Sequence, residues 1–213
     1  MLDRRQFGMT ALAAGLATGI VGGIVAGRAN AATDRIEPIL GEDGMYRQPW
    51  FVNSFLDLKE DLAEAAEAGK RFVVMWEQRG CPYCRETHMV NFARPDINQY
   101  VRDNFAVLQL DLFGSREVTD FDGETLEERA LARKWGIVFT PTIMFFAASV
   151  AEVEGKTGAR AEVARMPGYF KPFHFITMFQ YVKASAYERQ HFQKFLQAKG
   201  DRLRAEGVEV NLW

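Results

Sequence analysis

Short apolar runs alternate with amphipathic stretches along most of the chain. Three continuous apolar runs predict strands that are buried on both faces of a sheet. These runs span residues 71–76, 105–110 and 142–146. The stretches before and between them have the spacing or the boundary residues of helices. These predicted helices span residues 57–68, 81–92, 96–102 and 125–135. Helices that alternate with buried strands indicate an α/β sandwich.

The remaining segments have weaker patterns. Residues 113–123 are rich in Gly, Ser, Asp and Glu and are predicted as an exposed loop. Residues 150–166 are predicted to supply two more strands around a turn at residues 155–158. Because these strands are close enough to form a hairpin, we expect a mixed sheet. Pro172 suits the first turn of a helix, and a last, mostly polar helix is predicted at residues 187–205.

The first 31 residues have the order of an export signal. Arg4 and Arg5 precede a weakly apolar run at residues 9–26, and Ala29-Asn30-Ala31 offers a small-x-small cleavage site. The paired arginines resemble a twin-arginine signal, with the general secretory route as the other possibility. An uncleaved membrane anchor formed by residues 9–26 is the alternative, which the glycines of this run weaken. We therefore expect export to the periplasm.

The rest of the chain is long enough for one domain with a sizeable core. The predicted division is an export signal (1–31), an irregular lead-in (32–56), an α/β domain (57–187) and a helical C-terminal extension (188–213). The formal net charge of the whole chain is −2 at pH 7. This mildly acidic balance gives no reason to expect nucleic acid or an anionic membrane as a partner.

The chain has two cysteines, Cys81 and Cys84, and they form one Cys-x-x-Cys. A disulfide between them closes almost no chain and would add little stability through loop entropy. The pair is therefore a redox switch or half of a metal site. Cys81 lies where a predicted buried strand leads into a helix, so free N–H groups and the helix dipole can stabilise its thiolate. Lowering a thiol pKa from about 8.5 to about 7 corresponds to about 2 kcal/mol. We assign Cys81 as the nucleophile and Cys84 as the resolving thiol.

Two motifs in this order resemble the thioredoxin superfamily, over roughly residues 57–181. They are Phe72-Val-Val-Met-Trp76 followed by Cys81-Pro-Tyr-Cys84, and Trp135-Gly-Ile-Val-Phe-Thr-Pro-Thr142. The resemblance implies a thioredoxin-like fold: a mixed central sheet flanked by helices, here with an inserted loop and helix and a C-terminal helical extension.

The same resemblance implies a set of site residues. Pro141 would follow a cis peptide bond, and Thr140 would offer its backbone to an incoming peptide. Trp76, Pro82 and Tyr83 would border the substrate, with Trp76 also partly in the core. No cofactor is implied beyond a reversible Cys81–Cys84 disulfide, and the substrates would be protein disulfides or thiol carriers.

A narrower likeness rests on Trp76-Glu-Gln-Arg-Gly-Cys-Pro-Tyr-Cys84 and Met166-Pro-Gly-Tyr169. Both segments resemble the SoxW-type thioredoxins of sulfur-oxidation gene clusters. This implies a periplasmic dithiol that reduces thiosulfate-oxidation carrier proteins or related partners. A membrane electron-carrier protein would be its reductant.

Two departures from thioredoxins concern the redox chemistry. Pro82-Tyr83 replaces the usual Gly-Pro between the cysteines, and this dipeptide tunes the reduction potential. Val74 occupies the position of a buried aspartate. Glu77 is a candidate replacement as proton acceptor; a solvated charge at the end of the strand is the other interpretation.

Three functions remain open from the sequence: a thiol-disulfide reductase, a thiol oxidase or isomerase on the same fold, and a metal carrier. Cys81, Cys84 and His88 have a spacing that could contribute to a zinc or copper site. The chain supplies no further cysteine and only two other histidines, His174 and His191. We therefore expect no metal, and we expect His88 at the surface or packed within its helix.

Overall fold

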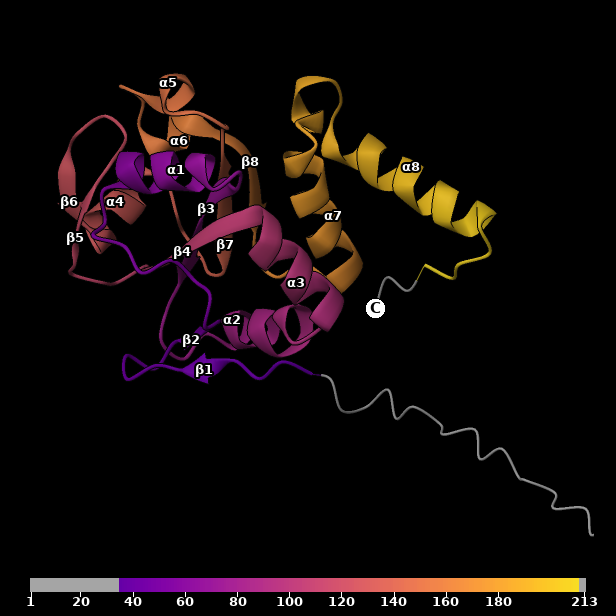
Figure 1. The fold of residues 1–213 in the computed structure, drawn as a ribbon. Helices are drawn as coiled ribbons and strands as arrows, with labels where there is room; N and C mark the ends of the chain where they lie inside the picture. Colours follow the sequence, from indigo (N-terminus) through magenta and orange to yellow (C-terminus); the bar gives the residue numbers. More distant parts are fainter. Residues whose placement is uncertain (1–34, 211–213) are drawn as a thin grey trace, which may run out of the picture. The chain divides into compact units, whose positions relative to one another are not determined.

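The computed structural model describes residues 35–210, and its centre is a four-stranded sheet with the order β4-β3-β7-β8 (Figure 1). β3 pairs in parallel with β4 and antiparallel with β7, and β7 pairs antiparallel with β8. The strands are β3 (Arg71–Glu77), β4 (Phe105–Asp111), β7 (Thr142–Phe146) and β8 (Glu162–Pro167). The three strands predicted from apolar runs are confirmed, and the sheet is mixed as expected.

The sheet separates two apolar cores. On β3, Phe72, Val74 and Trp76 belong to one core, whereas Val73 and Met75 belong to the other. Successive residues of a strand face opposite sides of the sheet, so a strand with helices on both faces is apolar throughout. This is why residues 71–77 are all buried.

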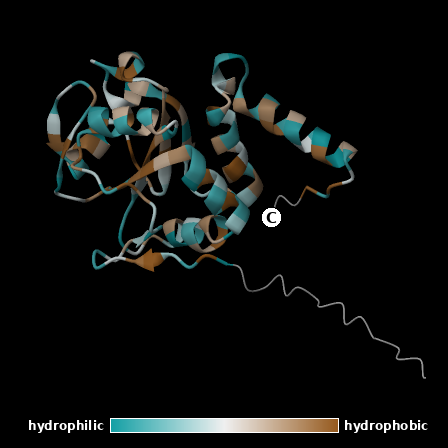
Figure 2. Cartoon of the chain, in the orientation of Figure 1, coloured by the Kyte–Doolittle hydropathy of each residue, from teal (hydrophilic) through white to brown (hydrophobic). Residues whose placement is uncertain are grey.

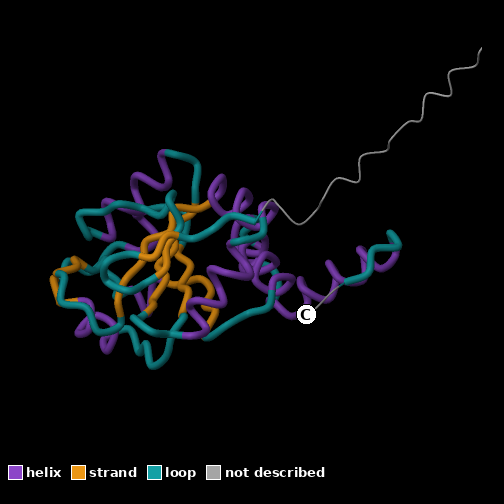
Figure 3. Tube along the Cα trace, turned by 90° about the horizontal axis from the view of Figure 1, so that it is seen from below, coloured by secondary structure: helices purple, strands orange, loops and turns teal. Residues whose placement is uncertain are grey.

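Helices cover both faces of the sheet (Figure 3). α1 (Leu58–Glu67) and α4 (Glu128–Lys134) contribute to the first core, and α3 (Pro95–Asn104) and α7 (Pro172–Lys183) to the second. The side chain of Asp57 accepts hydrogen bonds from two backbone N–H groups of α1 and so begins that helix where the sequence predicted it. The arrangement is the predicted α/β sandwich.

The predicted helix over residues 81–92 changes its winding halfway. An α-helical part, α2 (Pro82–Glu86), continues into a π-helical turn, η1 (Thr87–Phe92). α3 then begins at Pro95, whose missing N–H costs nothing in a first turn.

The prediction of an exposed loop at residues 113–123 is wrong for the second half of that segment. β5 (Glu117–Thr119) and β6 (Thr125–Glu127) form a small hairpin, and Phe121 between them is buried. The carboxylate of Asp120 accepts hydrogen bonds from the indole of Trp135 and from the backbone of Gly158, which ties the hairpin to the core. Because residues 125–127 pair as a strand, α4 begins later than predicted.

Residues 150–166 supply one strand, β8, and not the predicted two. The segment before β8 forms two short helices, α5 (Val150–Val153) and α6 (Gly158–Ala161). Ser149 and Glu152 form a reciprocal capping box that begins α5. A side chain at Gly158 would meet the ring of Trp135 at 2.0 Å, so the chain passes the core closely there.

The C-terminal extension packs against α7. A short 3-10 turn, η2 (Ala186–Glu188), leads into α8 (Phe192–Ala205), which begins later than the predicted residue 187. The ring of Tyr181 lies 5.6 Å from that of Phe192 and 5.4 Å from that of Phe195. Figure 2 shows both polar and apolar positions along α8, which fits a helix that buries only one side.

The lead-in is more ordered than predicted. β1 (Ile39–Leu40) and β2 (Tyr46–Arg47) form a hairpin, and Gln48 after it is buried. The N–H of Val52 donates a 2.9 Å hydrogen bond to the carbonyl of Val107, at the edge of β4. The lead-in therefore packs on the domain.

The predicted export signal lies outside the described residues. Within residues 35–210, the helices are all too short or too polar to cross a bilayer.

Candidate active site

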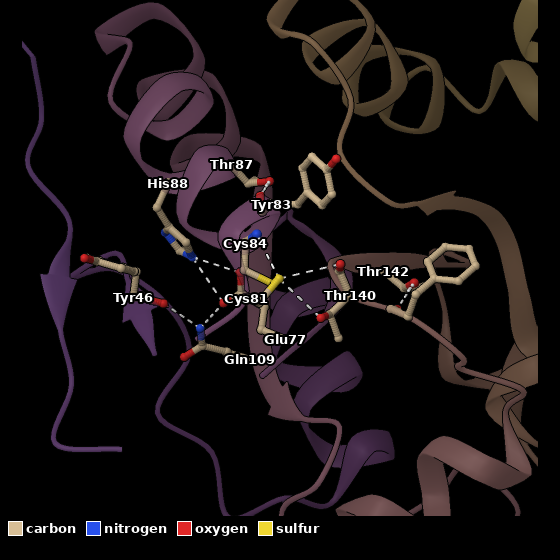
Figure 4. The surroundings of a disulfide bond; sticks show 11 residues. Tyr46, Glu77, Cys81, Tyr83, Cys84, Thr87, His88, Gln109, Thr140 and Thr142 are labelled. Carbon is tan, nitrogen blue, oxygen red and sulfur yellow. Dashed lines mark hydrogen bonds and ion pairs between the residues drawn. A yellow bond between two sulfur atoms is a disulfide. The ribbon is translucent and has the colours of Figure 1, made fainter. Parts of the chain in front are cut away.

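Cys81 and Cys84 form a disulfide at the junction of β3 and α2 (Figure 4). Gly80 has a positive φ of 71°, which lets the chain turn from the strand into the helix. The sulfur of Cys81 caps α2 by accepting a 3.0 Å hydrogen bond from the N–H of Cys84. Both cysteines are buried, with 7% and 5% of their surface exposed. The predicted place of the pair, at the start of a helix after a buried strand, is confirmed.

The loop before β7 lies against Cys81. The hydroxyl of Thr140 donates a 3.3 Å hydrogen bond to the sulfur of Cys81, and the carbonyl oxygen of Thr140 is 3.6 Å from the same sulfur. The Thr140–Pro141 peptide bond is cis, as the resemblance implied. The structure thus brings the two separate motifs together at one sulfur.

Apolar side chains are exposed at Tyr83, between the two cysteines, and in the segment directly before Thr140. Tyr83 is 61% exposed and stacks on Tyr169, with ring centroids 6.5 Å apart. On the Thr140 side, Val138 is 78% exposed and Phe139 is 49% exposed. We call Tyr83, Tyr169, Val138 and Phe139 the apolar rim. Burial, with a further contribution from the charge of Glu86, raises the pKa of Tyr169, so its hydroxyl is neutral at pH 7.

The rim differs in part from the predicted substrate-binding residues. Pro82 and Tyr83 are exposed beside the disulfide, in keeping with the expectation. Val138 and Phe139 were not predicted as site residues. The sequence does contain a signal for them, since they are two consecutive apolar residues directly before Thr140. They lie in a surface loop, where apolar side chains have no core to pack into.

Trp76 does not lie on the substrate rim. Its side chain is fully buried, and its indole packs edge-on against that of Trp135, with centroids 5.7 Å apart. The strand register places Trp76 on the face of the sheet that belongs to the first core. The expectation that it borders the substrate is therefore wrong, and its contacts are those of a core residue.

Glu77 and His88 form a buried pair close to the disulfide. They are 1% and 0% exposed, and Nε2 of His88 lies 3.2 Å from each carboxylate oxygen of Glu77. Gln109, on β4, also donates a hydrogen bond to Glu77. Glu77 is therefore not a solvated charge at the end of the strand. His88 packs inside the molecule, and the interpretation of it as a surface residue is wrong.

A cavity of about 480 Å³ separates the β1–β2 hairpin from the disulfide. Glu77, Cys81 and Cys84 all line it, and the hairpin contributes Met45 and Tyr46 on the opposite side. The volume exceeds the roughly 30 Å³ that one water molecule occupies in the liquid. Glu77, Cys81 and Cys84 therefore line one space that can hold water.

The described part of the chain contains no group of three or more His, Cys, Asp or Glu side chains arranged to hold a metal ion. Of the three residues with metal-ligand spacing, Cys81 and Cys84 form a disulfide with each other, and His88 forms a hydrogen bond with Glu77. The three side chains are therefore not arranged as the metal site that their spacing in the sequence would allow.

A comparison with family models gives a match over more than half of the chain. A family model described as a thioredoxin-like domain matches residues 58–183. No curated protein matches the chain. Among solved structures, a thioredoxin-fold protein from Helicobacter pylori has 15% identity and a TM-score of 0.49, and the match covers 67% of this chain and 98% of that one. A thioredoxin from Thermus thermophilus has 23% identity and a TM-score of 0.43, covering 59% of this chain and 83% of that one. The DsbD C-terminal domain from Neisseria meningitidis, in its oxidised form, has 17% identity and a TM-score of 0.38, covering 58% and 90% respectively.

Proposed function

Because this chain belongs to the thioredoxin-like domain family, whose model matches residues 58–183, we propose that it is a thiol-disulfide oxidoreductase. In this proposal it reduces disulfides of partner proteins through reversible oxidation of Cys81 and Cys84. The observation that carries the proposal is the Cys81–Cys84 disulfide, with the hydroxyl of Thr140 hydrogen-bonded to the sulfur of Cys81 and with apolar side chains of the rim exposed in the two segments that meet there.

The first step is attack by the thiolate of Cys81 on one sulfur of the substrate disulfide. A sulfur–sulfur bond forms between Cys81 and the substrate, the substrate disulfide breaks, and one substrate thiolate leaves. Thr140 lies beside Cys81, where its backbone can bind the substrate chain, and the apolar rim can bury apolar side chains of the partner.

The second step needs a proton acceptor for Cys84. Its thiol loses a proton, and the resulting thiolate attacks the sulfur of Cys81 and releases the second substrate thiolate. We assign the proton to Glu77, which lines the same cavity as both cysteines. Over one cycle the enzyme dithiol becomes a disulfide, the substrate disulfide becomes two thiols, and two electrons move to the substrate.

The oxidised enzyme then needs a dithiol reductant. We propose a membrane electron-carrier protein for this role, in keeping with an exported protein that has no soluble reductant at hand. The cycle uses no cofactor beyond the cysteine pair. The substrates are protein disulfides or thiol-carrier proteins, and the likeness of the two motifs to SoxW-type thioredoxins extends this proposal to carriers of sulfur oxidation in the periplasm.

Two measurements test the proposal. The full chain should catalyse reduction of insulin disulfides by dithiothreitol, and a Cys81→Ser variant should not. Equilibration with glutathione or dithiothreitol gives the reduction potential. A value near about −120 mV, as in strong periplasmic oxidants, would reverse the direction and make the protein a thiol oxidase. If the chain reduced no insulin, whatever its reduction potential, the proposal that it is a thiol-disulfide oxidoreductase would be overturned.

A further inference from the structure

A chain of buried hydrogen bonds reaches His88 from the lead-in segment. The indole N–H of Trp50 donates to Oδ1 of Asn98 at 3.0 Å, and Nδ2 of Asn98 donates to Oε1 of Gln48 at 2.9 Å. The amide of Gln48 then lies 3.3 Å from Nδ1 of His88. We call Trp50, Asn98 and Gln48 the amide chain. Asn98 and Gln48 are 2% and 1% exposed, so both amides are buried.

Asn98 has one possible orientation. An indole nitrogen only donates and a backbone carbonyl only accepts. Oδ1 of Asn98 faces the indole of Trp50, and Nδ2 faces the carbonyl of Phe92 at 2.9 Å. Exchanging the two amide atoms would set two donors against each other at one end and two acceptors at the other.

This orientation determines the proton position on His88. Since Nδ2 of Asn98 donates to Gln48, the oxygen of that amide is turned toward Asn98, and its nitrogen is turned toward His88. The amide nitrogen is a donor, so Nδ1 of His88 must accept. A neutral imidazole that accepts at Nδ1 carries its proton on Nε2. That nitrogen faces the carboxylate of Glu77.

Glu77 receives donors from both sides. Besides Nε2–H of His88, it accepts from Nε2 of Gln109, whose amide orientation is fixed because the same nitrogen donates to the carbonyl of Tyr46 at 2.6 Å. An ionised carboxylate is purely an acceptor, whereas a protonated one needs an acceptor for its own O–H. These partners therefore match the ionised form of Glu77.

The other neighbours of the imidazole are aromatic rings. Its ring centroid is 5.8 Å from that of Phe51 and 5.5 Å from that of Phe92, and the ring of Tyr46 is 6.4 Å away. Glu77 and Tyr46 are the titratable groups among these neighbours. A proton on Nδ1 would point at the NH₂ group of Gln48, and that contact is repulsive.

We propose that the amide chain positions the proton of His88. It holds the imidazole as the neutral Nε2–H tautomer, and this N–H holds Glu77 as the carboxylate that accepts the proton of Cys84. Trp50, Asn98 and Gln48 are positioning residues, since they act through His88 and do not touch the sulfurs. The catalytic part of this inference rests on the proposed function; the tautomer does not.

The tautomer is measured on the full chain with ¹⁵N-labelled histidine by long-range ¹H–¹⁵N NMR. His174→Gln and His191→Gln variants identify the signals of the other two histidines and leave His88 untouched. Between about pH 6 and about pH 8, around the ordinary histidine range, His88 should show a protonated Nε2 and an unprotonated Nδ1. A proton on Nδ1 at pH 7, in a neutral ring or an imidazolium, would overturn the proposal. This result needs no activity and no variant of the network.

Gln48→Glu tests the link to the chemistry. A carboxylate of nearly the same shape still accepts from Asn98, but it presents an acceptor to Nδ1 of His88. We expect Nδ1 to become protonated and the mixed disulfide with a peptide substrate to persist at least about tenfold longer in acid-quenched single turnovers. This is less than the roughly 10²–10⁴-fold contribution of a whole general base, because Glu77 itself is kept. The matched control is Gln99→Glu, an exposed neighbour of Asn98 on α3, which should change neither readout.

The outcomes separate this inference from the proposed function. An unchanged tautomer in Gln48→Glu would overturn the role of the amide chain. A changed tautomer with an unchanged lifetime of the mixed disulfide would overturn the step from His88 to Glu77. If Gln48→Glu does not fold, Asn98→Asp replaces the amide with an acceptor of nearly the same shape, which turns the NH₂ group of Gln48 toward residue 98 and its oxygen toward His88. Nδ1 of His88 should then become protonated, and a pure Nε2–H form in this variant would overturn the proposal. Failure of insulin reduction in the unaltered chain affects the proposed function alone.

Discussion

The hydroxyl of Thr140 donates a hydrogen bond to the sulfur of Cys81 from 59 residues further along the chain. The carbonyl oxygen of the same threonine lies against the same sulfur. The loop that carries Thr140 is therefore placed at Cys81, whereas Cys84 lies one helical turn further on. This asymmetry supports the different roles that we propose for the two cysteines.

Replacing the resolving thiol should trap the substrate. In Cys84→Ser, the mixed disulfide through Cys81 cannot be resolved, so we expect it to accumulate to near stoichiometry with the substrate and turnover to fall to background. Non-reducing mass spectrometry of protein mixed with a peptide disulfide measures the adduct. Cys81→Ser is the control and should trap nothing. An adduct on Cys84 in that variant, or none on Cys81 in the first, would reverse the assignment.

The apolar rim should bind protein substrates and not small ones. For Tyr83→Ala and Phe139→Ala we expect KM for a protein disulfide to rise about fivefold to tenfold each. A minority of contact side chains cost more than about 1 kcal/mol when truncated, and we assign these two exposed rings to that minority. Turnover of a small aromatic disulfide should stay within about twofold, because it needs little of the rim. Phe55→Ala removes a fully exposed ring in the lead-in, outside the rim, and should leave both substrates unaffected. Equal losses on both substrates would argue against a docking role.

Removing the charge of the buried acid should slow resolution. Glu77→Gln keeps the size of the side chain and its place between His88 and Gln109, but an amide is no base at neutral pH. We expect the lifetime of the mixed disulfide to rise at least about 100-fold, the lower end of general-base catalysis, with attack by Cys81 little changed. Glu67→Gln, at an exposed position of α1, is the matched control. Rapid-quench kinetics separate the two steps, and a selective loss of the first step would contradict the assignment of Glu77.

A second buried acid should make stability depend on pH. Burial raises the pKa of Asp61 to about 6, the neighbouring acidic residues Glu64, Asp57 and Glu60 add to this, and a hydrogen bond from Ser54 opposes it. The native state therefore holds a proton that the unfolded chain releases near pH 3.8. This contribution to stability is complete below the unfolded pKa and is lost as the pH rises through about 6.

The uncharged variant Asp61→Asn should escape that loss. We expect it to be about 2 kcal/mol more stable than the unaltered chain near pH 8 and to show no such gain near pH 4, since one pKa unit corresponds to about 1.4 kcal/mol. Urea unfolding at the two pH values measures the difference. Asp103→Asn changes a half-exposed carboxylate and should alter stability little at either pH. A loss of stability in Asp61→Asn near pH 8 would show that the charged form is the one the fold prefers.

The N-terminal segment should be removed on export. We expect the mature protein to begin at Ala32 and to be found in the periplasmic fraction, which N-terminal sequencing and cell fractionation measure. Arg4→Lys with Arg5→Lys should block export if the route is twin-arginine and should leave it intact if the route is general secretion. Recovery of the full-length chain from the membrane fraction would instead support an anchor at residues 9–26.

The parts of the fold that could be predicted are those with strong local patterns. Apolar runs such as residues 71–76 identify strands covered on both faces, and Pro172 marks the start of a helix. The three-residue strands β5 and β6 are too short for any periodicity, and Phe121 is buried because distant residues bind Asp120. The sequence Ser149-Val-Ala-Glu152 did contain a helix start, since it has the spacing of a capping box.

The residues of the candidate site also divide into those that the sequence predicts and those that it does not. Cys81, Cys84, Thr140 and Pro141 could be predicted because each belongs to a motif contiguous in sequence. Glu77 and His88 could not be paired in advance, because their contact depends on a helix that follows a turn and then winds as a π-helix. The amide chain is further from prediction, since it joins a polar segment without periodicity to a helix about 50 residues later.

The family resemblance begins at residue 58, but the hydrogen bonds of Gln48 and of the Tyr46 carbonyl extend the site back into the segment before it. Two proteins with the same Cys-Pro-Tyr-Cys and the same domain can therefore differ in redox behaviour if their N-terminal segments differ. Such a difference in redox behaviour would arise without a change in any recognisable motif. Conversely, transplanting this motif into a related domain would carry over the sulfur chemistry without the environment of its buried acid.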